Sequence, residues 1–238
     1  MINDLSVLAV IPARGGSKGI KLKNLRVVAG LPLVVIAGKI AQAISLIDRC
    51  VVSTDNEKIA EVAKLASIEV PFMRPQDIAG DEVGDWDVLN HALKTMEKID
   101  KIKYDIVVML QPTSPLRTPD MVSDVIKKLV LNNYDSVWSV SLTDSKYHPL
   151  KQLIISDEGD LDYFDKAGEA IIARQQLKNV YHRNGVAYAF TRECILNQKK
   201  IMGKRSGVHV ITGKQISIDT EEDIEEVEKC MENFLWAQ

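Results

Sequence analysis

The segment from residue 12 to residue 24 combines glycines with cations, as anion-binding loops do. It reads PARGGSKGIKLKN and places four cations within ten residues, Arg14, Lys18, Lys21 and Lys23. Glycines let the backbone turn so that successive N–H groups face an anion, and the cations supply the charge that a triphosphate requires. The spacing is neither GxxxxGK[ST] nor GxGxxG, which argues against a P-loop ATPase and a dinucleotide-binding enzyme. The competing interpretation is a solvated basic turn.

A second polar segment, residues 111–117, reads QPTSPLR and also follows a short apolar run. Its two prolines fix the backbone, because the proline ring locks φ. Gln111 can therefore present its amide in a fixed direction. The alternative interpretation is an ordinary turn between a strand and a helix, without a role in binding.

The elements that must position these loops alternate along the first 141 residues. Short apolar runs predict strands at 5–11, 49–53, 69–72, 105–110 and 136–141, and helical spacing of apolar residues predicts helices at 33–47, 56–66, 83–98 and 119–131. This α/β alternation predicts a Rossmann-like, mainly parallel sheet flanked by helices, with ligands at the carboxyl ends of the strands. The loops 12–24, 53–56 and 111–117 should therefore converge on one crevice.

The alternation breaks between residues 146 and 184, where short mixed segments contain Pro149, Gly159 and Gly168. We interpret residues 1–238 as a single domain and 146–184 as an excursion from it, suited to dimerisation and substrate binding. The pattern resumes with a strand at 186–190. A last helix begins at Thr220, where Thr220 and Asp223 have capping-box-like spacing.

Composition restricts the function. The chain has 238 residues, is 46% hydrophobic and 26% charged, and carries a net charge of −3, which argues against a nucleic-acid partner. Three cysteines without CxxC spacing argue against a disulfide framework or zinc site and favour the cytoplasm. The apolar run at 7–11 is too short for a signal peptide or a membrane span. Without a GxSxG elbow, a hydrolase triad is unsupported.

The loop 12–24 resembles the signature of the acylneuraminate cytidylyltransferases, the CMP-sialic acid synthetases and CMP-legionaminic acid synthetases. The matching residues are Arg14, Ser17, Lys18, Lys23 and Asn24. The run LQPTSPLR at 110–117 resembles a second motif of the same family, and HPLK at 148–151, RQQL at 174–177 and NG at 184–185 resemble three more. The resemblance covers residues 8 to about 228 and implies the fold of nucleotide-diphospho-sugar transferases.

The resemblance implies a reaction between CTP and a nonulosonic sugar acid, which gives a CMP-sugar and pyrophosphate. No protein nucleophile is needed, so positioning and charge neutralisation should carry catalysis. Arg14 and Lys23 are the candidates for stabilising the phosphates. The implied nucleotide contacts are Arg14, Gly15, Ser17, Lys18, Lys23, Asn24, Arg74 and Asp85. Asp85 could accept a hydrogen bond from the cytosine amino group or cap the following helix, and both interpretations stay open.

The sugar acid is expected to contact Gln111, Lys151, Arg174, Asn184 and Tyr188, some of them supplied by the neighbouring protomer of a homodimer. Asp219 is the expected catalytic metal ligand for Mg²⁺ or another divalent cation. Where the family has a second aspartate, this chain has Ser217. One carboxylate is still adequate for Mg²⁺, which retains waters and binds phosphate oxygens.

Three questions stay open on the sequence. Relatives often have an arginine just before the Asn-Gly pair, and either His182 or Arg183 fills that role here. The acceptor could be a different sugar, such as ketodeoxyoctonate or a sugar 1-phosphate. The chain could also be a binding protein that has lost activity, an alternative supported by Ser217 alone.

Overall fold

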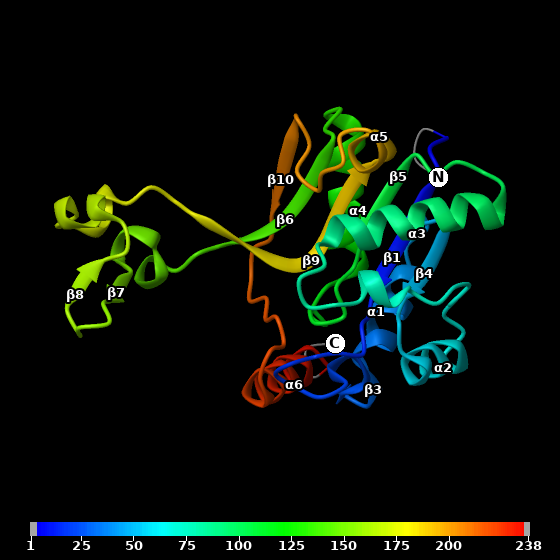
Figure 1. The fold of residues 1–238 in the computed structure, drawn as a ribbon, viewed down its shortest axis with the longest axis horizontal. Coiled ribbons are helices and arrows are strands. Elements are labelled where there is room, and N and C mark those ends of the chain that lie inside the picture. Colours follow the sequence, from blue (N-terminus) through cyan, green and yellow to red (C-terminus); the bar gives the residue numbers. More distant parts are fainter. Residues whose placement is uncertain (1–3, 236–238) are drawn as a thin grey trace.

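The computed structural model, which describes residues 4–235, contains a six-stranded sheet between two layers of helices (Figure 1). The strand order is β10-β6-β9-β5-β1-β4. β9 runs antiparallel to both of its neighbours and the other pairs are parallel, which confirms the predicted mainly parallel sheet. The strands are β1 Val7–Pro12, β4 Arg49–Ser53, β5 Ile106–Met109, β6 Ser136–Leu142, β9 Tyr181–Thr191 and β10 Ser206–Val210.

Each face of the sheet has its own hydrophobic core because side chains alternate along a strand. Val7, Ala9 and Ile11 of β1 pack into the core beneath α1, α2 and α4, whereas Leu8 and Val10 pack into the core beneath α3 and α5. A third cluster joins α1 to the C-terminal helix α6. The helices are α1 Leu33–Gln42, α2 Glu57–Leu65, α3 Asp85–Asp100, α4 Pro119–Leu131, α5 Arg192–Leu196 and α6 Glu221–Leu235.

Side-chain caps explain where several helices begin. The Asn56 side chain accepts hydrogen bonds from the N–H groups of Lys58 and Ile59 at the start of α2. Thr118 caps α4, with Pro119 at the first helical position. Asp223 accepts from the Thr220 N–H, and the Asp223 N–H donates to the Thr220 hydroxyl, so the predicted capping box is confirmed.

Several predicted elements differ from the structure. Residues 69–72 form no strand; only Glu69 bridges to Val51, because Pro71 lacks the N–H that a continuing ladder needs. α1 ends at Gln42 rather than near residue 47. The helix was predicted too long because Ile44, which follows it in a loop, packs into the same core and continues the apolar spacing. α5 and β10, each five residues long, were not predicted.

Residues 143–180 form an arm that projects away from the sheet (Figure 1). Its centre is a two-stranded antiparallel sheet of β7 Leu153–Ile155 and β8 Leu161–Tyr163. Where the arm begins and ends, Leu142 of β6 pairs with Tyr181 of β9. The arm lies at the excursion expected over residues 146–184, and its role in dimerisation stays a prediction.

No helix within residues 4–235 combines the length and the apolar character needed to cross a membrane.

Candidate active site

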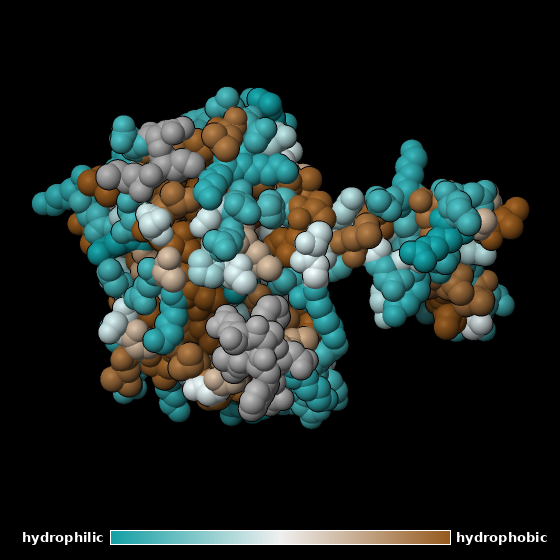
Figure 2. All heavy atoms as spheres, turned by 180° about the vertical axis from the view of Figure 1, so that it is seen from behind, coloured by the Kyte–Doolittle hydropathy of each residue, from teal (hydrophilic) through white to brown (hydrophobic). Residues whose placement is uncertain are grey.

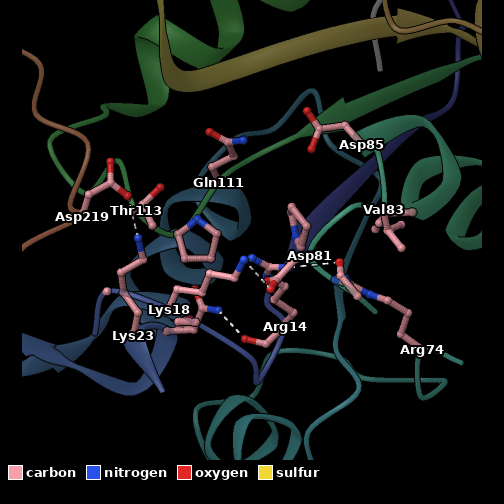
Figure 3. Close-up of a pocket in the computed structure, with 17 residues that line it drawn as sticks. Arg14, Lys18, Lys23, Arg74, Asp81, Val83, Asp85, Gln111, Thr113 and Asp219 are labelled. Atoms are coloured by element: carbon pink, nitrogen blue, oxygen red, sulfur yellow. Dashed lines mark hydrogen bonds and ion pairs between the residues drawn. The ribbon is translucent and has the colours of Figure 1, made fainter. Parts of the chain in front are cut away.

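A pocket of about 440 Å³ opens at the carboxyl ends of β1 and β5, a volume typical of small-ligand sites (Figure 3). It is bounded by the loop after β1, the segment before α3, the loop after β5 and the residues before α6. Nine predicted site residues line it: Arg14, Ser17, Lys18, Lys23, Asn24, Arg74, Asp85, Gln111 and Asp219. The loops 12–24 and 111–117 therefore converge as predicted.

Two cations of the glycine-rich loop meet at one carboxylate inside the pocket. Arg14 Nη1 lies 2.8 Å and Lys18 Nζ lies 2.9 Å from the two oxygens of Asp81 (Figure 3). The hydrogen bond from Lys18, aided by the charge of Arg14, lowers the pKa of Asp81 below its usual value. The geometry shows that these two side chains can hold one anion jointly, as a phosphate requires.

Lys23 and Asp219 form a second charged group beneath the pocket. Lys23 Nζ donates to the Ile218 carbonyl and to Asp219 Oδ1, both at 2.8 Å (Figure 3). The Lys23 side chain is 16% exposed and that of Asp219 is 73% exposed. Lys23 is therefore held in place, whereas most of the Asp219 carboxylate is free to meet a ligand.

The glycine-rich loop is fixed by contacts from behind the pocket. Asn24 is buried and its Nδ2 donates to the Arg14 carbonyl at 2.9 Å. Gly19 approaches the chain so closely that a Cβ there would lie 2.7 Å from the Asp219 carbonyl oxygen, so the position requires glycine. These contacts bring the loop and the Asp219 segment together from opposite ends of the sequence.

Three placements correct the sequence analysis. Gly15 does not line the pocket, and its N–H donates to Asp55 Oδ1 at 2.9 Å instead of pointing into the pocket. The loop 53–56 accordingly supports the glycine-rich loop from behind instead of forming the pocket wall. Lys21 also faces away and lines a separate surface hollow with Lys58.

Arg74 lines the pocket from a buried position. Its Nε and Nη2 donate to the Oγ and the carbonyl oxygen of Ser53 at 3.1 and 2.5 Å. Burial lowers the pKa of Arg74 to about 10. The side chain is thus a fixed cation at the end of β4, and its predicted contact with the nucleotide stays a prediction.

The loop that presents Gln111 is held by a buried arginine that the sequence analysis did not assign. Arg117 donates to the carbonyl oxygens of Gln111, Ser114 and Gly185. Burial lowers the pKa of Arg117 to about 9, and the coulombic interaction with Tyr188 opposes that shift. Among the described residues no carboxylate pairs with this guanidinium. The arginine therefore acts as an internal clamp on the loop.

We expect Arg117→Met to lower the free energy of unfolding by about 3 kcal/mol, because buried carbonyls lose their donor. Urea unfolding followed by circular dichroism measures the loss. Lys127→Met, at an exposed position on α4, is the control and should change stability by no more than about 0.5 kcal/mol. Equal unfolding midpoints for the two variants would contradict the clamp.

Asn184 and Tyr188 do not line the pocket, and their predicted contact with the sugar acid stays a prediction. Asn184 Oδ1 accepts from the Ser139 hydroxyl at 2.6 Å, and its Nδ2 donates to Ser141 at 3.1 Å. Tyr188 is 1% exposed and its hydroxyl accepts from the Gly185 N–H. Both side chains fix the backbone around Gly185, whose φ of +72° suits glycine.

Gly185 also allows β9 to lie against the Gln111 loop. A Cβ at this position would lie 2.2 Å from Ser114 Oγ and 2.8 Å from Gln111 Oε1. The Asn-Gly pair is thus needed for packing beside the pocket.

Asp85 occupies the first position of α3, after the N-cap Gly84. Its carboxylate lines the pocket and forms an ion pair with Arg183 at 2.8 Å rather than capping the helix through its side chain. The carboxylate also benefits from the positive end of the helix dipole. Neither interpretation of Asp85 from the sequence, a contact with cytosine or a helix cap, included Arg183 as its partner.

Lys151 and Arg174 lie on the arm and do not line the pocket of their own protomer. Both side chains are exposed. Arg174 instead borders a small hollow at the base of the arm, together with His148 and Leu177.

The metal expectation depends on Asp219. No cluster of three or more metal-binding side chains occurs in the described part of the chain. The exposed Asp219 carboxylate in a pocket lined by cations nevertheless fits Mg²⁺, which takes one or two carboxylates together with phosphate oxygens and water. Ser217 is exposed two residues earlier and does not line the pocket.

A family of proteins described as cytidylyltransferases matches residues 8–238 of the chain. CMP-N,N'-diacetyllegionaminic acid synthase of Legionella pneumophila is 31% identical over 234 residues, covering 96% of this chain and 97% of that protein. Pseudaminic acid cytidylyltransferase of Campylobacter jejuni is 30% identical over 219 residues, covering 92% and 93%. The solved structure of CMP:2-keto-3-deoxy-manno-octonic acid synthetase complexed with CTP superposes with a TM-score of 0.70 at 17% identity, covering 96% of this chain and 99% of that one. That likeness concerns the fold.

Proposed function

The chain belongs to the cytidylyltransferase family, and on that premise we propose that it joins CTP to a nonulosonic sugar acid, giving a CMP-sugar and pyrophosphate. The observation that carries this proposal is the pairing of Arg14 and Lys18 on one carboxylate inside the pocket. Two cations at that spacing suit the phosphates of a nucleotide. Relatives named for pseudaminic, legionaminic and N-acylneuraminic acids support this acceptor class.

A pyrophosphate-release assay with Mg²⁺ tests the proposal. CTP is combined in turn with N-acetylneuraminic acid, a legionaminic acid, a pseudaminic acid and ketodeoxyoctonate, and each of the other three nucleoside triphosphates replaces CTP in parallel. We expect release with CTP and at least one nine-carbon acid. Release with ketodeoxyoctonate alone would favour the alternative acceptor, and CTP binding without release would favour a binding protein.

In the proposed reaction the anomeric hydroxyl of the sugar acid attacks the α-phosphorus of CTP. A phosphorus–oxygen bond forms to the sugar as the bond to pyrophosphate breaks, and the hydroxyl proton passes to solvent or a nearby base. Arg14 and Lys18 hold phosphate oxygens in place of Asp81, and Lys23 adds charge from below. Gln111, fixed by its clamped loop, orients the acceptor.

We propose that Asp219 holds Mg²⁺ or another divalent cation together with the triphosphate. Such an ion would neutralise charge on phosphate oxygens. Lys23 positions the Asp219 carboxylate at the pocket edge. The cytoplasm is the proposed setting, supported by three cysteines that are free of disulfides.

We further propose a homodimer built through the arm. Figure 2 shows apolar side chains gathered on the projecting arm, which has few neighbours of its own to cover them. Ile155 is 73% exposed, Phe164 66% and Ile172 93%. Large exposed apolar patches mark interaction surfaces. The arm also carries Lys151 and Arg174, two predicted acceptor contacts that do not reach the pocket of their own protomer.

Mixing two inactive variants tests whether the arm completes the partner's site. Arg14→Ala disables the pocket of its own protomer, and Arg174→Ala disables the arm. If arms cross, a mixed dimer contains one intact site, so random pairing should restore about a quarter of wild-type turnover. Variants are mixed in mild denaturant, refolded and assayed for pyrophosphate release. Activity that never exceeds the sum of the two separate variants would contradict a shared site.

A further inference from the structure

The guanidinium of Arg183 lies behind the pocket wall and pairs with Asp85, which lines the pocket. It lies 4.6 Å from the ring centroid of Trp138 and 4.7 Å from that of Tyr188. Both rings are themselves anchored, since Trp138 Nε1 donates to the Ile201 carbonyl and the Tyr188 hydroxyl accepts from Gly185. The two ring centroids lie 5.5 Å apart, so the guanidinium packs against both rings and loses rotamer freedom before any ligand arrives.

An irregularity in β9 creates this stack. Val140 pairs with Arg183 and Trp138 pairs with Tyr188, so two steps along β6 correspond to five along β9. The extra residues include Gly185 with its positive φ. The bulge brings Arg183 and Tyr188 to the same ring of Trp138, as bulges near active sites often redirect a side chain.

The neighbouring His182 faces elsewhere. Successive side chains of a strand point to opposite faces. His182 Nδ1 lies 2.9 Å from the Thr143 hydroxyl at the base of the arm, whereas Arg183 reaches Asp85 of the pocket wall. Of the two residues that the sequence left open, the structure describes a hydrogen bond to a residue that lines the pocket only for Arg183.

Arg183 is a cation whose ion-pair partner, Asp85, lies on the opposite side of the pocket from Asp219 (Figure 3). Arg14 and Lys18 pair with Asp81 on the phosphate side, and Lys23 lies beneath them with Asp219. The Arg183 side chain is 41% exposed, so a ligand can reach it. Asp85 takes one of the five N–H donors of the guanidinium, which leaves donors for a second acceptor.

We propose that Arg183 binds the carboxylate of the acceptor sugar acid through its guanidinium fork. This assignment rests on the proposed function and adds a specificity-determining residue to it. A planar guanidinium matches a carboxylate with two parallel hydrogen bonds, which a lysine cannot reproduce. Asp85 balances the charge of Arg183 in the absence of the acid and holds the fork toward the pocket.

The test compares Arg183→Gln, Arg183→Lys and His182→Gln in the pyrophosphate assay. Arg183→Gln should raise KM for the sugar acid roughly 10- to 100-fold, as expected for loss of a charge-assisted hydrogen bond, and change KM for CTP by less than about threefold. Arg183→Lys should raise KM for the sugar acid less than Arg183→Gln does, but should not restore the wild-type value. His182→Gln should keep both constants. Equal rises in both KM values, or an unchanged KM for the acid, would overturn the assignment.

An analogue whose carboxylate is replaced by a carboxamide separates direct contact from a structural role. Wild type should bind this analogue, measured as an inhibitor, roughly 10- to 100-fold more weakly than it binds the acid, and Arg183→Gln should bind both alike. Persistent discrimination by Arg183→Gln would refute direct contact. Wild-type enzyme that releases no pyrophosphate with any acid refutes the proposed function instead, and the assignment with it.

Discussion

Arg14→Ala should lower the rate of pyrophosphate release by roughly 10²- to 10³-fold, the usual effect of removing one donor from a charge-stabilising site. Arg14 contributes a guanidinium to the part of the pocket where we propose that the phosphates bind, and there it and Lys18 share Asp81. Without it, Lys18, Lys23 and the buried Arg74 are the described cations that still line the pocket. Steady-state kinetics with saturating CTP and acceptor measure the loss.

The fold should survive this substitution. The Arg14 side chain is 34% exposed and its hydrogen bonds go to Asp81 and the Gly80 carbonyl at the surface. Exposed ion pairs contribute at most about 1 kcal/mol, so the thermal midpoint should fall by only a few degrees. Lys21→Ala is the matched control, because Lys21 belongs to the same loop and faces away from the pocket. If Lys21→Ala is as inactive as Arg14→Ala, the loop needs overall charge rather than a placed guanidinium.

The fold was predictable from sequence wherever local pattern and tertiary packing agree. The buried strands at β4 and β1 are short apolar runs, and α4 begins at a proline after a threonine cap. Prediction failed where one residue overrides the pattern, as Pro71 does at the expected third strand. It failed also for α1, whose apolar spacing continues past the last helical residue because a loop residue, Ile44, packs into the same core.

The site was less predictable because sequence motifs do not distinguish a residue that touches a ligand from one that supports it. Asn184 and Arg117 both belong to motifs beside the pocket, yet their polar atoms are used inside the protein. The ion pair between Asp85 and Arg183 joins residues 98 apart, and nothing local indicates it. A basic residue directly before an Asn-Gly pair was the available signal, and choosing between His182 and Arg183 required the register of β9.

Removal of divalent cations should abolish pyrophosphate release, and Asp219→Asn should lower it roughly 10²-fold while raising the Mg²⁺ concentration needed for half-maximal rate. The physical reason is that Asp219 is the most exposed of the described carboxylates that line the pocket, at 73% against 40% for Asp81 and 28% for Asp85. Turnover is measured across a Mg²⁺ titration after treatment with EDTA. Full activity in excess EDTA would rule out the metal.

A second comparison separates metal binding from the ion pair with Lys23. If Asp219 only positions Lys23, then Lys23→Gln and Asp219→Asn should lower the rate equally and leave the Mg²⁺ requirement unchanged. Glu221→Gln is the charge-matched control, since Glu221 pairs with Arg26 outside the pocket and its loss should leave the titration unaltered.

Ser217→Asp adds a carboxylate two residues before Asp219, at an exposed position. If Asp219 is a metal ligand, this substitution should lower the Mg²⁺ requirement, because a second oxygen donor strengthens binding of a hard cation.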